Sequence, residues 1–163
     1  MKSQIYCGVD NGLSGALVAL QGTTILELKV MPVITSTKAK REYDIHEIVE
    51  FFKRYPTATV ILEKAHAMPK LGSVQAFSFG KNYGIIVGIV SALHLRYQIV
   101  HAKTWQKEMF RDINYNDTKQ ASAIVAQRLF PDIDFKATKK CKKVHDGMTD
   151  SCSIACYGQR MNL

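Results

Sequence analysis

The feature that most constrains this chain is its first apolar stretch, residues 6–20, which an acidic and glycine-bearing turn interrupts. The pattern predicts a strand ending at Asp10, a turn through Gly12 and a second strand. Asp is unfavourable in strands, and a buried carboxylate is costly unless a partner or a metal ion compensates its charge. Asp10 is therefore either a turn residue that accepts backbone hydrogen bonds or a metal ligand at the end of a central strand.

Hydrophobic periodicity divides the rest of the chain into strands and helices. Strands are expected at residues 4–10, 14–21, 24–31, 59–63 and 97–100, and a basic loop is expected at 32–43. Helices are expected at 45–54, 73–95, 117–130 and 146–161, and another is expected to begin near Thr104. Short connections make the first three strands antiparallel, whereas a helical crossover places the fourth strand parallel beside the first. The expected fold is a single α/β domain over residues 1–163, with a mixed five-stranded sheet of three antiparallel and two parallel strands flanked by helices.

Three further carboxylates accompany Asp10. Glu63 ends the fourth expected strand, and Asp146 and Asp150 share one face at the start of the last expected helix. An acid at a helix start also satisfies the helix dipole, which explains Asp146 better than Asp150. Four carboxylates held together repel one another, so cations must make the arrangement favourable. Oxygen ligands select Mg²⁺ or Mn²⁺, and a pair of such ions suits phosphoryl chemistry.

The distribution of charge indicates a polyanionic partner. The chain carries a net charge of +8, and many of its basic residues gather in two expected loops, although such runs are often only solvated surface. Beside a carboxylate site they become candidate contacts for a nucleic-acid backbone. The residues concerned are Lys38, Lys40, Arg41, Lys136, Lys139, Lys140, Lys142 and Lys143.

Other features bear on compartment and oligomeric state. The four cysteines show no paired spacing and are expected to be reduced. No targeting segment or membrane-spanning stretch is visible, which predicts a soluble, intracellular protein without membrane contact. Gly80, Gly84 and Gly88 form a small-residue stripe on the long expected helix, which is otherwise apolar nearly all round. Such a helix is either central to the core or shared with another subunit, and we expect a homodimer through it.

Several segments together resemble the RuvC-type Holliday junction resolvases. They are residues 8–16, 60–63, 66–70 and 145–150, with residues 77–81 and 154–158 similar to the phage and chloroplast branch of that family. The resemblance implies an RNase H-like fold and a homodimer that resolves four-way DNA junctions by paired symmetric nicks, in DNA recombination and repair. It implies two Mg²⁺ per active site, or Mn²⁺ in their place, and a bacterial or phage-infected cytoplasm, with an organelle left open. The implied ligands are Asp10, Glu63, Asp146 and Asp150.

The same resemblance assigns roles outside the carboxylate cluster. Lys103 is expected to act as a catalytic residue that stabilises phosphate charge beside the metals. Phe77 and Phe79 cannot share one narrow helix face, so at most one is expected to wedge against unstacked bases, unless both are core residues. His145 is a metal ligand, a water-positioning residue or, as favoured here, a histidine of the basic loop that contacts DNA phosphates. The expected DNA-binding residues are Lys70, Phe77, Phe79, Lys81, Lys107, Lys139, Lys140, Lys142, Lys143 and His145.

The chain departs from the family pattern in two places. Asn11 stands where proline is common, and the last two acids are four residues apart rather than the three of some members. Two alternatives keep the same fold: another RNase H-like nuclease acting on branched DNA, and a non-catalytic junction-binding protein. A kinase-like ATPase would use a similar glycine turn to hold phosphate, but such enzymes need two domains, and 163 residues are too few.

Overall fold

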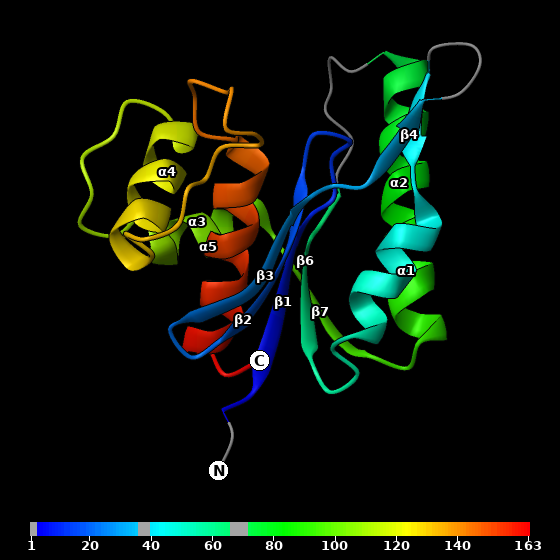
Figure 1. Cartoon of the computed structure of the whole chain (residues 1–163), viewed down its shortest axis with the longest axis horizontal. Helices are drawn as coiled ribbons and strands as arrows, with labels where there is room; N and C mark the ends of the chain where they lie inside the picture. The colour runs from blue at the N-terminus through cyan, green and yellow to red at the C-terminus, as the bar shows by residue number, and fades with distance from the viewer. Residues whose placement is uncertain (1–2, 36–39, 66–71) are drawn as a thin grey trace.

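The computed structural model describes residues 3–35, 40–65 and 72–163. A five-stranded sheet lies at its centre, with strand order β3-β2-β1-β6-β7 (Figure 1). The strands are β1 (Ile5–Asp10), β2 (Ala16–Gln21), β3 (Thr24–Val30), β6 (Thr59–Glu63) and β7 (Arg96–Val100). Strands β1 to β3 pair antiparallel, whereas β1, β6 and β7 run parallel. The mixed sheet expected from the sequence is confirmed, while the expected contacts Lys38 and Lys70 lie outside the described residues.

Helices cover both faces of this sheet. They are α1 (Ile45–Lys53), α2 (Ser73–Ala92), α3 (Ala102–Met109), α4 (Thr118–Leu129) and α5 (Asp146–Arg160). Figure 1 shows α3, α4 and α5 on one side of the sheet and α1 and α2 on the other. Residues that alternate along β1 supply both layers, because Tyr6 joins the core on the α5 side whereas Cys7 and Val9 join the core on the α1 side.

Helix α5 packs very closely on the sheet. A Cβ at Gly8 of β1 would lie 2.0 Å from the Ser151 carbonyl oxygen, so only glycine permits this approach. Gly158 allows a similar contact with β6, where an added Cβ would lie 2.4 Å from Ile61 Cγ1. The helix is buried nearly all round, because α3 and α4 cover the side that the sheet does not. The position of α5 over β1 is thus set by backbone contact.

A second, two-stranded sheet corrects the expectation of a loop at residues 32–43. Strands β4 (Val33–Thr35) and β5 (Arg41–Tyr43) pair antiparallel, with Val33 opposite Tyr43. Each strand has only three residues and no repeated apolar alternation, so the sequence carries little strand signal there. This hairpin reaches the turn after β1 and contributes to the site described below.

Local signals at several other positions are confirmed. The Asp44 side chain caps α1 by accepting the Glu47 N–H at 3.1 Å, as its position before an apolar helix predicts. The cysteines are free thiols, and Cys7, Cys152 and Cys156 are buried. In the described part of the chain, no helix is long and apolar enough to cross a membrane.

Candidate active site

The carboxyl ends of β1 and β6 bring Asp10 and Glu63 to one edge of the sheet. Val9 pairs with Leu62 in the parallel register, so the residues that follow lie on adjacent strands, about 4.8 Å apart. Strand β1 is apolar and buried up to Val9, which presents Asp10 at the point where the strand ends. Asp10 also has the turn role, because its Oδ1 accepts the Gly12 N–H at 3.2 Å. The two interpretations of Asp10 are therefore compatible.

The first two turns of α5 carry Asp146 and Asp150 to the same edge. Gly147 lies against the turn between β1 and β2, where an added Cβ would be 2.6 Å from the Gly15 Cα. This contact sets the start of α5 over the end of β1. His145 caps the helix, since its Nδ1 accepts a backbone N–H of the first turn at 3.3 Å. His145 thus has a structural role in addition to those expected from the sequence.

The carboxylates influence one another's ionisation. The pKa of Asp10 is raised to about 7, first by burial and then by the charges of the other three acids, with Asp150 foremost among them. Burial likewise raises the pKa of Asp150 to about 6, with contributions from Glu63 and Asp146. A hydrogen bond from Ser122 opposes that increase. Negative charge is therefore concentrated here, and a cation would be bound favourably.

Lys119 partly compensates this charge. Its Nζ, in the first turn of α4, lies 2.7 Å from Asp146 Oδ2, and both side chains are largely exposed. The pairing raises the pKa of Lys119. An exposed ion pair contributes little to stability, so its main consequence is the positive charge that it places beside Asp146. No local spacing in the sequence indicates this lysine, because it stands apart from the basic loops and only the fold brings it to Asp146.

Glu63 and the turn after β1 are held by donors from other elements. The Trp105 indole Nε1 of α3 donates to Glu63 Oε2 at 2.8 Å. The hairpin residues Tyr43 and Arg41 donate hydrogen bonds to backbone carbonyls of the turn that follows Asp10. These donors come from parts of the chain far from the acids, so no local spacing points to them. They restrict the orientation of the carboxylates before any ligand binds.

Asn11 links the two strand ends. The residue is buried, and its Nδ2 donates to the Glu63 carbonyl oxygen at 3.4 Å. Proline, which is common at this place in the sequences that the chain resembles, has no side-chain donor. The departure at Asn11 therefore adds a polar contact between β1 and β6 beside the acids.

The donor set suits a hard divalent cation. All four acids offer carboxylate oxygens, which Mg²⁺ and Mn²⁺ prefer, and Asp10 and Asp150 have pKa values raised partly by neighbouring negative charge. Among the residues that the structure describes, no group of three or more His, Cys, Asp or Glu side chains is arranged as a metal site. The fold thus brings oxygen donors to one edge of the sheet without closing a coordination shell around a cation.

The expected basic contacts occupy several surfaces. Lys103 and Lys107 are exposed on α3. The Lys103 side chain points about 200° around the helix axis from that of Trp105, which places it on the side of α3 opposite Glu63. Its catalytic role stays a prediction. Lys81 of α2 pairs with Glu42 at 3.3 Å. The lysines exposed in the loop before α5 are Lys139, Lys140, Lys142 and Lys143.

The two phenylalanines near the start of α2 have different environments. Phe77 is 73% exposed, whereas Phe79 is half-buried. Two residues that are two apart on a helix point in different directions, so this difference is expected. Phe77 is the ring available to a ligand, and its contact with DNA bases stays a prediction.

The sheet order and the helices on both faces define an RNase H-like fold. Two solved structures match almost the whole chain. The T. thermophilus RuvC in complex with Holliday junction substrate has a TM-score of 0.66 and 15% identity, covering 97% of this chain and 96% of that one. The Thermus thermophilus RuvC structure has a TM-score of 0.59 and 13% identity, covering 98% and 97%. No protein-family model and no curated protein matches the sequence. Because the sequence identities are only 15% and 13%, these matches show a shared fold and nothing further.

Proposed function

We propose that this chain is a structure-selective DNA endonuclease that resolves four-way junctions by paired symmetric nicks. The observation that carries the proposal is the cluster of acids at one sheet edge, where the pKa values of Asp10 and Asp150 are raised to about 7 and about 6. Burial and like charges shift pKa values in this way at catalytic sites. The likeness to a RuvC in complex with a Holliday junction substrate supports branched DNA as the substrate.

The proposed catalytic residues would also hold divalent ions, two Mg²⁺ per site or Mn²⁺ in their place. Those residues are Asp10, Glu63, Asp146 and Asp150. Bound ions supply Lewis-acid stabilisation of phosphate charge and lower the pKa of water. The chain's own residues prepare the site, because the Gly12 N–H orients Asp10 and the Trp105 indole orients Glu63. Lys119, already beside Asp146, adds positive charge where a phosphate would enter.

The DNA backbone is proposed to lie along the loop that leads into α5. This loop ends at His145 and the acidic first turn of α5, so a strand held by its lysines passes beside the acids. Lys103, Lys107 and Lys81 would extend the contact to α3 and α2, and the exposed Phe77 ring would wedge against unstacked bases at the crossover.

The homodimer contact is proposed on α2. One side of this helix is buried, at Ile86 and Val90 among others. Among the described residues, no atom lies within 4 Å of a Cβ added at Gly80, Gly84 or Gly88. Each glycine costs about 1 kcal/mol relative to alanine inside a helix, and a second backbone packed on the stripe would compensate that cost. A two-fold dimer would also present matching sites to opposed strands of a four-way junction.

Gly84→Leu is expected to convert the dimer to a monomer without unfolding it. The structure has open space at Gly84, so a larger side chain is compatible with the single chain but not with a second helix packed against the stripe. Light scattering after gel filtration should report twice the chain mass for the unmodified protein and once the chain mass for the variant. Gln127→Leu, at an exposed position of α4, is the matched control. A monomeric unmodified protein, or a variant that stays dimeric, would contradict this interface.

A gel assay with four-way, duplex and single-stranded DNA, in Mg²⁺ and in EDTA, tests the proposed function. We expect paired nicks in the four-way junction with Mg²⁺, binding without cleavage in EDTA, and little cleavage of duplex DNA. Cleavage of other branched DNA to an equal extent would indicate a broader RNase H-like nuclease. Junction binding with no cleavage in either Mg²⁺ or Mn²⁺ would indicate a non-catalytic junction-binding protein.

A further inference from the structure

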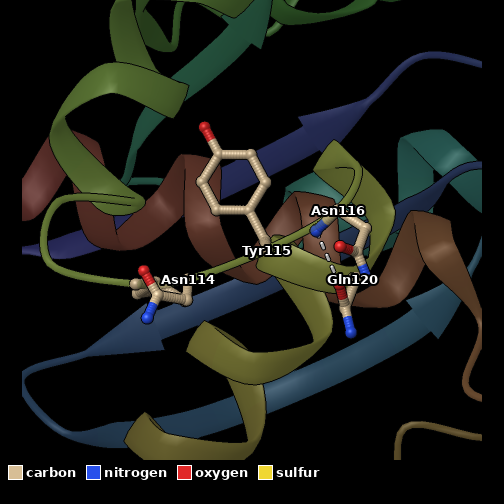
Figure 2. Close-up of a pocket in the computed structure, with 5 residues that line it drawn as sticks. Asn114, Tyr115, Asn116 and Gln120 are labelled. Atoms are coloured by element: carbon tan, nitrogen blue, oxygen red, sulfur yellow. Dashed lines mark hydrogen bonds between the residues drawn. The ribbon is translucent and has the colours of Figure 1, made fainter.

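The connection between α3 and α4 forms a surface pocket outside the acid cluster. Its volume is about 410 Å³, and it is lined by Ile113, Asn114, Tyr115, Asn116 and Gln120. Figure 2 shows the Tyr115 ring projecting from the chain, with the side chain of Gln120 beside Asn116. Gln120 Oε1 accepts the Asn116 backbone N–H at 2.8 Å, which fixes the side chain and leaves its amide nitrogen for a ligand. None of the five lining residues is charged.

Contacts connect this pocket to the acid cluster. The Tyr115 ring, 45% exposed, packs edge-on against Phe110 at 5.6 Å between centroids. Phe110 in turn packs against Trp105 at 5.4 Å, and the Trp105 indole donates to Glu63. On the other side, Gln120 directly follows the lysine that pairs with Asp146. The pocket is therefore linked to the proposed active site by a chain of contacts through α3 and by neighbouring residues of α4.

We propose that this pocket holds an unstacked nucleobase beside the reacting phosphate and sets the sequence preference of cleavage. Cationic side chains are the usual partners of nucleic-acid phosphates, whereas this uncharged lining suits a neutral, planar group. Side-chain amides of Asn and Gln pair with the donor and acceptor pattern of base edges, and a Tyr ring offers a stacking surface for a base. The volume falls within the range of small-molecule pockets, about 300–1,000 Å³. This inference rests on the proposed function, since the base must belong to a DNA substrate.

The first experiment measures cleavage preference on four-way junctions with randomised nucleotides around the crossover. Cut positions are sequenced for the unmodified protein, Tyr115→Ala and Gln120→Ala. We expect the enrichment of preferred nucleotides to fall about tenfold in both variants, while the total cutting of the pool falls less. Tyr115→Phe keeps the ring and should keep the preference, and Gln127→Ala, on the same helix about two turns away, is the matched control. If the unmodified protein cuts the junction and both variants keep its nucleotide preference, the base pocket is wrong and the proposed function still stands.

A second experiment needs no cleavage. A short single-stranded DNA carrying 2-aminopurine is titrated with the full chain in EDTA, because stacking on an aromatic ring quenches this fluorescent base. We expect quenching by the unmodified protein and by Tyr115→Phe, and loss of quenching with Tyr115→Ala while the DNA still binds by anisotropy. Equal quenching by Tyr115→Ala, or none by the unmodified protein, overturns the base pocket. Quenching by a protein that cuts no junction would support the pocket and contradict the proposed nuclease.

Discussion

Asp10→Asn is expected to reduce junction cleavage by about 10³-fold while junction binding in EDTA is retained. Asn keeps the size of Asp and an oxygen for the Gly12 N–H, but it removes the charge that would hold a divalent ion between β1 and β6. The DNA contacts proposed for the lysine loop are untouched. Single-turnover cleavage and a binding titration measure the two effects. Cleavage by the variant at the unmodified rate in Mg²⁺ would show that the acid cluster has been assigned the wrong role.

The same substitution is expected to stabilise the metal-free protein above neutral pH. The pKa of Asp10 is near 3.8 in an unfolded chain and about 7 in the folded protein, so the folded state binds this proton more tightly. The unfavourable contribution of ionised Asp10 is absent below about pH 4, grows between pH 4 and 7, and is complete above pH 7. Asn cannot ionise, so its advantage should appear at pH 8, on the order of a few kcal/mol, and vanish near pH 4.

Denaturant unfolding in EDTA at pH 4 and pH 8 measures this stability difference. Asp132→Asn, an exposed acid, is the matched control and should change stability little at either pH. Addition of Mg²⁺ should stabilise the unmodified protein more than Asp10→Asn, because the variant has lost a proposed ligand. A variant that is less stable than the unmodified protein at pH 8 would show that Asp10 is compensated in the folded state.

Gly8→Ala is expected both to destabilise the fold and to slow cleavage. The added Cβ would lie 2.0 Å from the Ser151 carbonyl oxygen and 2.7 Å from the Ala155 nitrogen, and backbone atoms cannot rotate away. Helix α5 must then move off β1, at about 3 kcal/mol or more, and carry Asp146 and Asp150 with it. A displacement of about 1 Å at a reacting centre costs on the order of 10²-fold in rate. Urea unfolding and junction cleavage measure the two losses.

Gly88→Ala separates packing from the general effect of adding a methyl group. Gly88 lies inside α2, and no described residue is within 4 Å of its added Cβ. In the monomeric Gly84→Leu protein, where no second helix packs on the stripe, we expect Gly88→Ala to raise stability by about 1 kcal/mol. Gly8→Ala with unchanged stability would show that α5 and β1 are not in backbone contact. A stable Gly8→Ala protein that has lost cleavage would locate the effect in the position of the acids alone.

The two acids at the strand ends could be predicted from local sequence patterns, whereas their hydrogen-bond partners could not. Short continuous apolar runs in β1 and β6, with a helical crossover between them, predict that Asp10 and Glu63 are neighbours, and the structure has them on adjacent strands. The hairpin that reaches the same turn could not be predicted, because its three-residue strands carry no alternation. Trp105 and Lys119 were also missed as partners of the acids. Each is isolated in the sequence, and only the packing of α3 and α4 around α5 brings them to the site.

The sequence by itself determined the mixed sheet, its flanking helices and the candidate acids, because these follow from short-range patterns of apolar residues, turns and charge. Tertiary structure decided which donors hold the acids, how closely α5 approaches β1, which side of α2 is open and where the pocket of Tyr115 lies. Those properties depend on distances between residues far apart in the chain. Such distances are set when the helices pack on the sheet, and no local spacing encodes them.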